Sequence, residues 1–382
     1  MTRGGAVLTL ASTALVAFAA LLGAGCERRE PSHDPDVRPT HDKSPGHVEH
    51  ATPAAARFAA GADSYARYCA LCHAADGSGY AADNAPSLVS RTFLESATND
   101  FIAKSIREGR PGTAMSGYAK ARGGPLDDDE IASIIGFLRT SAGTPAAAKL
   151  PSLVGIGDVA SGEHVYQANC QRCHGTRTDR GTAVHLANPM FLGAASDSFL
   201  RHAIVNGRPG TPMPSFDGVL PENHIDDVVA YVRSLATPAP APRQPPPEIP
   251  KGPAVIHPKG KDPEFTLRAD RFVPIDAVKT ALEQGKRMVI IDARAVPDWV
   301  SMHIPGSISV PYYGFARLDE LPKDGTWILA YCACPHHASG VVVDELRKRR
   351  FPHTAILDEG ILEWKKRSYP TESYQAPDAG SP

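Results

Sequence analysis

The chain has 382 residues, which on ordinary domain sizes predicts two to four domains. Acidic and basic residues nearly cancel, with a formal charge of −2 at pH 7, and this argues against binding to nucleic acid or a polybasic membrane contact. Four of the seven cysteines form two CxxCH pentads, so cysteine spacing is the first informative pattern.

Residues 1–26 predict an export signal: Arg3 gives a positive start, an apolar stretch follows, and small residues lead to Cys26. A lipoprotein processed at Cys26 and a retained membrane helix are both open, and Gly23 departs from the residue usual three positions before a lipidated cysteine. We therefore expect a protein of the periplasm or cell envelope, with a lipid anchor at Cys26 as one outcome.

Residues 27–57 predict a flexible tether, because a stretch rich in Pro, His, Asp and Glu cannot bury a core. A solvated linker is the simpler interpretation of its histidines, and metal binding is the alternative. These histidines are His33, His41, His47 and His50.

An internal repeat predicts two related domains, at residues 58–142 and 154–237. Three blocks recur in the same order and at nearly constant spacing. The matched blocks are 61–73 with 162–174, 101–115 with 199–213, and 131–139 with 225–233.

Each copy predicts a helix leading into CxxCH, a variable loop, a short helix ending at Gly109 or Gly207, a methionine loop and a closing helix. Apolar residues at i, i+3, i+4 and i+7 support the closing helix. A unit of this size has little core of its own, so a covalently held macrocycle would complete it. The predicted N-caps of the closing helices are Asp127 and Asn223.

The CxxCH spacing suits haem attachment. Two thiols can form thioether bonds to the vinyl groups while the histidine binds the iron from one face. A methionine on the other face would complete six-coordination, which favours electron transfer over substrate binding. The predicted attachment and ligand residues are Cys69, Cys72, His73 and Met115 in the first copy and Cys170, Cys173, His174 and Met213 in the second.

Other interpretations of these residues stay open. A CxxC pair can be half of a zinc site or a redox dithiol, and a methionine can simply fill a core. Pro212 and Pro214 flank Met213 and fix its backbone, whereas Met115 has no such neighbours, so we expect the more labile bond to iron at Met115. The alternative ligands in the second copy are His185, His202 and Met190.

Residues 58–142 and 154–237 resemble class I cytochrome c. The resemblance rests on the pentads and on the methionine that follows each at a similar distance. It implies an all-helical fold around each of two covalently attached haem c groups. The implied ligand pairs are His73 with Met115 and His174 with Met213.

Residues 238–264 form a proline-rich linker, which favours polyproline II and predicts a semi-rigid spacer that keeps the third domain apart. Residues 265–375 then alternate strand and helix signals. MVIID, SISVP and TWILAYC predict strands, and Gly340 to Arg349 predicts a helix. The third domain is therefore expected to be α/β with a mainly parallel sheet.

Residues 265–375 resemble the rhodanese family. The motifs, in order, are IIDAR at 290–294, HIPGSISVP at 303–311, a strand running into Cys332 and DEGILEW at 358–364. The resemblance implies that Asp292 and Arg294 shape the edge of the site and that Cys332 carries a persulfide. A cysteine between a buried strand and a helix faces N–H groups that stabilise its thiolate.

The loop CACPHHAS departs from the family pattern, because His337 and Ala338 stand where an arginine and a serine are common. Cys334 adds a second thiol. Three interpretations stay open: an active persulfide site with Cys334 as a resolving thiol and His337 as the loop's cation, a non-catalytic docking module, and a disulfide, metal or oxyanion site.

The sequence as a whole predicts two all-α cytochrome c domains and one α/β rhodanese-like domain. The expected function is electron transfer in the cell envelope, linked to sulfur-compound chemistry, with respiratory-chain proteins as redox partners and a sulfur anion as substrate. The alternative is a pure electron relay whose third domain only binds a partner.

Overall fold

The structure is a computed structural model that describes residues 52–152, 157–241, 254–333 and 336–374. The predictions made for the leader, for most of the tether and for Cys334 fall outside the described residues. Among the residues described, no helix combines the length and apolar character that a membrane crossing requires.

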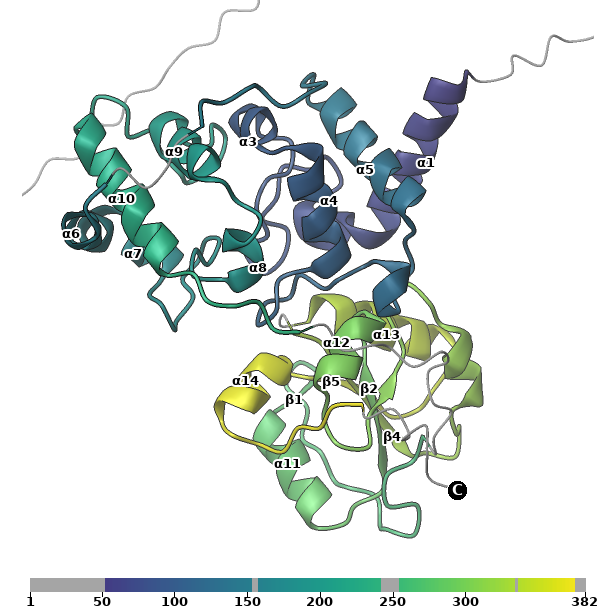
Figure 1. The fold of residues 1–382 in the computed structure, drawn as a ribbon. Coiled ribbons are helices and arrows are strands. Elements are labelled where there is room, and N and C mark those ends of the chain that lie inside the picture. The colour runs from purple at the N-terminus through teal and green to yellow at the C-terminus, as the bar shows by residue number, and fades with distance from the viewer. Residues whose placement is uncertain (1–51, 153–156, 242–253, 334–335, 375–382) are drawn as a thin grey trace, which may run out of the picture. The chain divides into compact units, whose positions relative to one another are not determined.

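The first cytochrome-like domain is helical, as predicted (Figure 1). Asp127 caps the last helix through a capping box with Glu130, which confirms the predicted N-cap. Gly109 ends the fourth helix with φ 67°, a conformation that favours glycine. The helices are α1 (Pro53–Tyr68), α2 (Ala70–His73), α3 (Arg91–Ser96), α4 (Asn99–Glu108) and α5 (Asp128–Ser141), with a 3₁₀ turn at Lys120–Arg122.

The second domain repeats this order. Its closing helix begins at Glu222 with Pro221 as N-cap, so the predicted cap at Asn223 is wrong. Pro221 has φ −56° and no N–H to satisfy, and its carbonyl already accepts the N–H of Ile225, so the helix starts earlier. The helices are α6 (Val159–Asn169), α7 (Gln171–His174), α8 (Pro189–Leu192), α9 (Asp197–Asn206) and α10 (Glu222–Ser234).

The first and last long helices of each copy cross in close contact at a glycine. A Cβ on Gly162 of α6 would lie 1.9 Å from the carbonyl oxygen of Asp227 in α10. In the first copy, a Cβ on Gly61 of α1 would lie 2.2 Å from the carbonyl oxygen of Ser133 in α5. Only glycine lets the two backbones approach this closely, which explains why it recurs at this position of the repeat.

The two cytochrome-like domains share one apolar core cluster. Phe93 and Phe101 of the first domain pack against Phe191 and Phe199 of the second. Hydrogen bonds border this contact: Thr92 Oγ1 donates to the Gly207 carbonyl over 2.8 Å, and Asn188 Nδ2 donates to the Pro111 carbonyl over 3.0 Å. The two copies of the repeat therefore pack against each other.

The third domain is a five-stranded parallel sheet between helices, which confirms the predicted α/β class. Alternate residues of the central strands face α13 on one side and α11 with α14 on the other. In sheet order the strands are β1 (Phe272–Val273), β5 (Thr354–Leu357), β4 (Trp327–Tyr331), β2 (Met288–Asp292) and β3 (Ile308–Ser309), and the helices are α11 (Ile275–Glu283), α12 (Val296–Ser301), α13 (His337–Lys348) and α14 (Gly360–Lys366).

Residues 242–253 of the predicted spacer lie outside the described residues, and the expectation that the third domain stands apart from the first is wrong. Tyr118 and Tyr312 share a hydrogen bond between their hydroxyls at 3.0 Å, and the Tyr312 hydroxyl also donates to the Tyr68 carbonyl over 2.7 Å. Arg67 Nη2 donates to the Tyr313 carbonyl over 3.0 Å. The composition of a linker limits its reach, but it carries no information on whether the surfaces that it joins fit each other.

Candidate functional sites

The two pentad histidines are held in the same way. His73 Nδ1 lies 2.8 Å from the Pro86 carbonyl oxygen, and His174 Nδ1 lies 2.7 Å from the Val184 carbonyl oxygen. A carbonyl only accepts, so Nδ1 carries the proton and Nε2 the lone pair. Burial lowers the pKa of both imidazoles and favours their neutral form. This is the tautomer and charge state that an iron ligand requires.

The pentad cysteines lie at the junction of two helices. Cys69 and Cys170 end α1 and α6, and Cys72 and Cys173 lie on the short helices that follow. Burial raises the pKa of Cys69 to about 12, and burial is also the main reason that the pKa of Cys170 rises to about 11. A redox dithiol needs the opposite shift, so this environment argues against that alternative. A zinc site needs further ligands, and among the described residues no group of three or more His, Cys, Asp and Glu side chains could hold a metal ion.

Two buried tyrosines hold the pentads in place. The sequence analysis assigned them no role. The Tyr65 hydroxyl donates to the Ala74 carbonyl over 2.8 Å, and the Tyr166 hydroxyl donates to the Gly175 carbonyl over 2.9 Å. Each tyrosine is 1% exposed and belongs to the helix before its pentad. Both tyrosines occupy the same position of the repeat, and this recurrence is the sequence signal by which they could have been found.

The methionine loops form the same hydrogen-bonded turn in both domains. The N–H of Arg110 donates to the Met115 carbonyl over 2.7 Å, and the N–H of Arg208 donates to the Met213 carbonyl over 3.0 Å. Within each turn a threonine hydroxyl accepts the methionine N–H, at 3.1 Å for Thr113 and 3.2 Å for its counterpart. Both methionines are half-buried.

A cavity in the first domain brings the predicted residues together. Cys69, Cys72, His73 and Met115 all line it, and its walls include apolar side chains from α3, α4 and α5. Arg110 also lines the cavity, and burial lowers its pKa to about 10. A cation in an apolar cavity calls for an anion, and haem carries two carboxylates. The residues present therefore fit haem, with Arg110 as a partner that sequence reasoning missed.

The alternative ligands of the second domain lie in different places. His185 lines the cavity of the first site, and its Nε2 lies 2.9 Å from the Thr176 carbonyl oxygen. Met190 is 6% exposed within the core. His202 lies on α9 and is partly exposed, but its Nδ1 is buried and has no hydrogen-bond partner among the described residues. Burial and the charge of Arg208, which belongs to the Met213 turn, lower the pKa of His202. Met213, in contrast, lies in a hydrogen-bonded turn that matches the turn of Met115, and Met115 lines the cavity of the first domain.

Cys332 directly follows β4 in the third domain and is 2% exposed. Its Sγ lies 3.3 Å from the hydroxyl of Ser339 on α13. The N–H of Ile361 donates to the Cys332 carbonyl over 3.0 Å. Gly360, with φ 70°, allows this close approach, because a Cβ there would lie 2.6 Å from the same carbonyl oxygen. The DEGILEW motif thus positions the cysteine.

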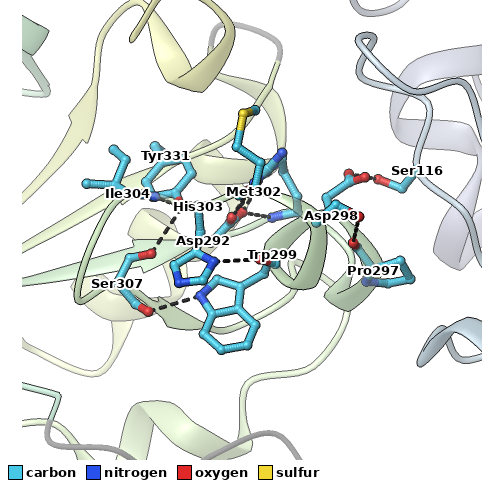
Figure 2. Close-up of polar contacts among 12 residues, drawn as sticks. Ser116, Asp292, Pro297, Asp298, Trp299, Met302, His303, Ile304, Ser307 and Tyr331 are labelled. Atoms are coloured by element: carbon cyan, nitrogen blue, oxygen red, sulfur yellow. Dashed lines mark hydrogen bonds and ion pairs between the residues drawn. The ribbon is translucent and has the colours of Figure 1, made fainter. Parts of the chain in front are cut away.

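Asp292 and Arg294 form a buried ion pair, with Arg294 Nη2 2.6 Å from Asp292 Oδ2. The same nitrogen donates to the Met302 carbonyl over 2.5 Å, and the guanidinium lies 5.8 Å from the centre of the Tyr331 ring. Figure 2 shows Asp292 in this polar cluster beside Met302 and Tyr331. The pair therefore fixes the loop after α12 against the end of β4, next to Cys332.

The histidines of the loop differ in their surroundings. His336 Nε2 lies 2.6 Å from Asp358 Oδ1, and its ring centre lies 4.1 Å from that of Phe272, so the fold holds this side chain. His337 begins α13, three residues before the predicted start of the helix. In the sequence both histidines lie between Cys332 and Ser339, whose Sγ and hydroxyl oxygen are 3.3 Å apart.

Comparisons with known proteins agree with this division of the chain. The family model described as cytochrome c oxidase, cbb3-type, subunit III matches residues 56–138 and 157–232, and the rhodanese-like domain model matches residues 275–367.

Two curated relatives match the helical part. The cbb3-type cytochrome c oxidase subunit FixP of Bradyrhizobium diazoefficiens is 32% identical over 180 residues, which cover 44% of this chain and 57% of that protein. Cytochrome c6 of Diacronema lutheri is 33% identical over 88 residues, which cover 21% of this chain and 99% of that protein. The chain thus spans somewhat more than half the length of its cbb3-type relatives.

Among solved structures, the rhodanese-like domain of an Anabaena sp. protein is 27% identical and covers 28% of this chain and 85% of its own, with a TM-score of 0.25. The pentads, the buried neutral histidines, the paired methionine turns and these sequence matches lead to one conclusion. The chain belongs to the cytochrome c family, with two cytochrome c domains followed by a rhodanese-like domain.

Proposed function

We propose that each cytochrome c domain holds one covalently attached haem c and that the chain transfers single electrons in the cell envelope. Cys69 and Cys72 would carry the thioether bonds in the first domain, with His73 and Met115 as ligands. Cys170, Cys173, His174 and Met213 would do the same in the second domain. A haem bound there supplies a one-electron iron couple.

The observation that carries this proposal is the duplicated arrangement of histidine and methionine. In both domains a carbonyl fixes the histidine with Nε2 as the available nitrogen, and in both a threonine-braced turn presents the methionine. Two neutral side chains of this kind would hold the iron without leaving a position for substrate, which would suit electron transfer. The lining of the cavity at the first site is mostly apolar, and such a lining would favour a raised potential.

Haem content tests the proposal. Full-length protein matured by a c-type haem assembly system should give two haems per chain in a pyridine haemochrome assay. The double variant Cys69→Ala, Cys72→Ala should give one. A content of one or none in the unaltered protein contradicts the proposal.

The third domain supports a second activity, sulfur transfer. In the proposed step the Cys332 thiolate attacks the outer sulfur of thiosulfate, a new S–S bond forms, and sulfite leaves with the electron pair of the broken bond. Cys332 becomes a persulfide and no external oxidant is needed. The close Ser339 hydroxyl supports this role, because it can donate to the thiolate.

Mass spectrometry of the full chain tests the sulfur step. Incubation with thiosulfate should add one sulfur atom to Cys332, and Cys332→Ser should prevent it. If no sulfur is found on Cys332 with either thiosulfate or polysulfide, the third domain is a docking module. Helix α13 lies against the pentad helix α2 of the first domain, and this contact favours that alternative function.

The partners we propose are redox proteins of a respiratory chain. The support is the similarity to subunits of cbb3-type oxidases, which extends over the two cytochrome c domains. Location in the periplasm or cell envelope, with a lipid anchor at Cys26 as one outcome, is part of the same proposal and rests on the leader sequence alone.

A further inference from the structure

Over residues 109–116 and 207–214, the two methionine loops differ only at the two residues that flank the methionine. In the second domain Pro212 and Pro214 restrict the backbone on both sides of Met213. In the first domain the same two positions hold Ala114 and Ser116, which leave the backbone free to rotate. The turns nevertheless have the same hydrogen bonds. Something other than local sequence must therefore restrain the loop of Met115.

The third domain supplies a polar contact to this loop. Ser116 is 5% exposed, and its hydroxyl donates to Asp298 Oδ2 over 2.5 Å, as Figure 2 shows. Asp298 lies in the first turn of α12. Burial raises the pKa of Asp298, and the nearby charge of Arg294 with the Ser116 hydrogen bond opposes this shift. The carboxyl is thus enclosed, and Ser116 is one of the groups that compensate its loss of water.

Two further residues of the loop also contact the third domain. Ala114 packs against the buried residues on both faces of the parallel sheet. Tyr118 shares its hydrogen bond with Tyr312, which follows β3. Positions 114, 116 and 118 therefore contact the third domain at every second residue, and Met115 lies between the first two while lining the cavity.

We propose that the rhodanese-like domain positions the methionine loop of the first cytochrome c domain, with Asp298 as a positioning residue that acts through Ser116. The contact between domains takes the place of the two prolines that restrain the loop in the second domain. This inference rests on the proposed ligation of iron by Met115. On this proposal, a change in the conformation of the third domain would alter how firmly Met115 is held at the first site.

Competition by imidazole tests the proposal on the full chain. In a Met213→Ala background, the remaining near-infrared sulfur-to-iron band would report Met115 alone. Ser116→Ala should then raise the affinity for added imidazole by on the order of tenfold, the net worth of a hydrogen bond to a carboxylate. Asp298→Ala should do the same. Asp298→Asn keeps an acceptor and should retain most of the unaltered resistance to imidazole.

A proline swap provides the decisive comparison. Ala114→Pro with Ser116→Pro removes the contact to Asp298 but gives the loop the flanking residues of the second domain, and imidazole affinity should return to the unaltered level. The swap is compatible with the turn, because neither Ala114 nor Ser116 donates a main-chain hydrogen bond among the described residues. Ser133→Ala is the matched control, because it removes the hydroxyl of a half-buried serine that hydrogen-bonds only within α5, to the Asp129 carbonyl, among the described residues.

The outcomes separate the two proposals. If Met115→Ala leaves the remaining near-infrared band unchanged, ligation by Met115 is wrong. If that variant abolishes the band but Ser116→Ala behaves as Ser133→Ala, the positioning role of Asp298 is wrong. A proline swap that fails to restore imidazole resistance also overturns the positioning role. Should Asp298→Ala unfold the third domain, Ser116→Ala carries the test.

Discussion

The ring of Phe101 stacks on the ring of Phe199, with centroids 4.8 Å apart and planes at 27°. The two residues occupy the same position in the two copies of the repeat, and they are 8% and 5% exposed. Each cytochrome c domain thus completes the core of the other. The short segment between the copies joins two units that are one packed body.

This stacking predicts that a substitution in one domain weakens both. Phe199→Ala should lower the free energy of unfolding by about 3 kcal/mol, the usual effect of removing a buried phenylalanine. Thermal unfolding followed at the haem absorption of each domain should show both shifting together. Phe58→Ala, at a ring that is 40% exposed, is the control and should have a much smaller effect. Equal effects of the two variants would contradict a shared core.

The helix crossings predict a position-dependent effect of adding one methyl group. Gly162→Ala should prevent normal packing of α6 on α10, because the new Cβ would lie 1.9 Å from the Asp227 carbonyl oxygen. Gly136→Ala in α5, where nothing lies within 4 Å, should stabilise the protein by up to about 1 kcal/mol through helix propensity. Chemical denaturation measures both. A Gly162→Ala protein as stable as the unaltered chain would rule out this close crossing.

Asp227 predicts a pH dependence of the second domain. Its carboxylate accepts the Ser161 hydroxyl and the Asp158 N–H, both at 2.7 Å, and these hydrogen bonds lower its pKa below the ordinary 3.8. A lowered pKa in the folded state means that the stabilisation is present above pH 3.8 and is lost as pH falls through the folded value.

The corresponding variant tests that sign. Asp227→Asn should lower the melting temperature at pH 7, and the difference from the unaltered protein should shrink below pH 3.8. Glu163→Gln, on the exposed side of α6, is the control and should change the melting temperature little at either pH. A difference that grows with acidity would show that Asp227 is not stabilising as a carboxylate.

Met213 predicts a spectroscopic change. Met213→Ala should remove its share of the near-infrared sulfur-to-iron band and lower one reduction potential, because a soft ligand is replaced by water or a nearby imidazole. Met190→Ala, which truncates a buried methionine of the same domain, should lower stability and leave the band intact. The reverse result would move the ligand to Met190.

Cys334 predicts a change in persulfide lifetime. A neighbouring thiol can attack a persulfide and release its outer sulfur, so Cys334→Ser should leave sulfur loading of Cys332 intact and prolong the loaded state. Time-resolved mass spectrometry after removal of thiosulfate measures this decay. Sulfur found on Cys334 alone in the unaltered chain would reassign the nucleophile.

The sequence predicts local features of this fold well and contacts between domains poorly. Asp127 and Gly109 mark helix ends because capping needs particular residue types. The predicted cap at Asn223 is wrong because the helix already begins at Glu222, with Pro221 as its N-cap and no side-chain capping bond. The contact between Tyr118 and Tyr312 has no period or motif, since it depends on the shapes of two separately folded surfaces.

The candidate sites divide in the same way. The pentads and methionines can be predicted because the repeat contains each of them twice and haem chemistry requires these residue types. Arg110 also recurs in the repeat, but only its position in the apolar cavity indicates a role. Asp292 and Arg294 were predicted from the family resemblance. The structure adds that they form an ion pair with each other and that Arg294 donates to the Met302 carbonyl, so the pair also holds the loop after α12 in place.

The hydrogen bond from Ser116 to Asp298 joins residues 182 positions apart, and this separation sets an order of events during synthesis. A chain is synthesised from its N-terminus, so the first pentad is made long before α12. On the proposed function, haem attachment to Cys69 and Cys72 could take place at that stage, while the loop of Met115 still lacks its restraint. The first site would then reach its final ligation only when the last third of the chain has folded.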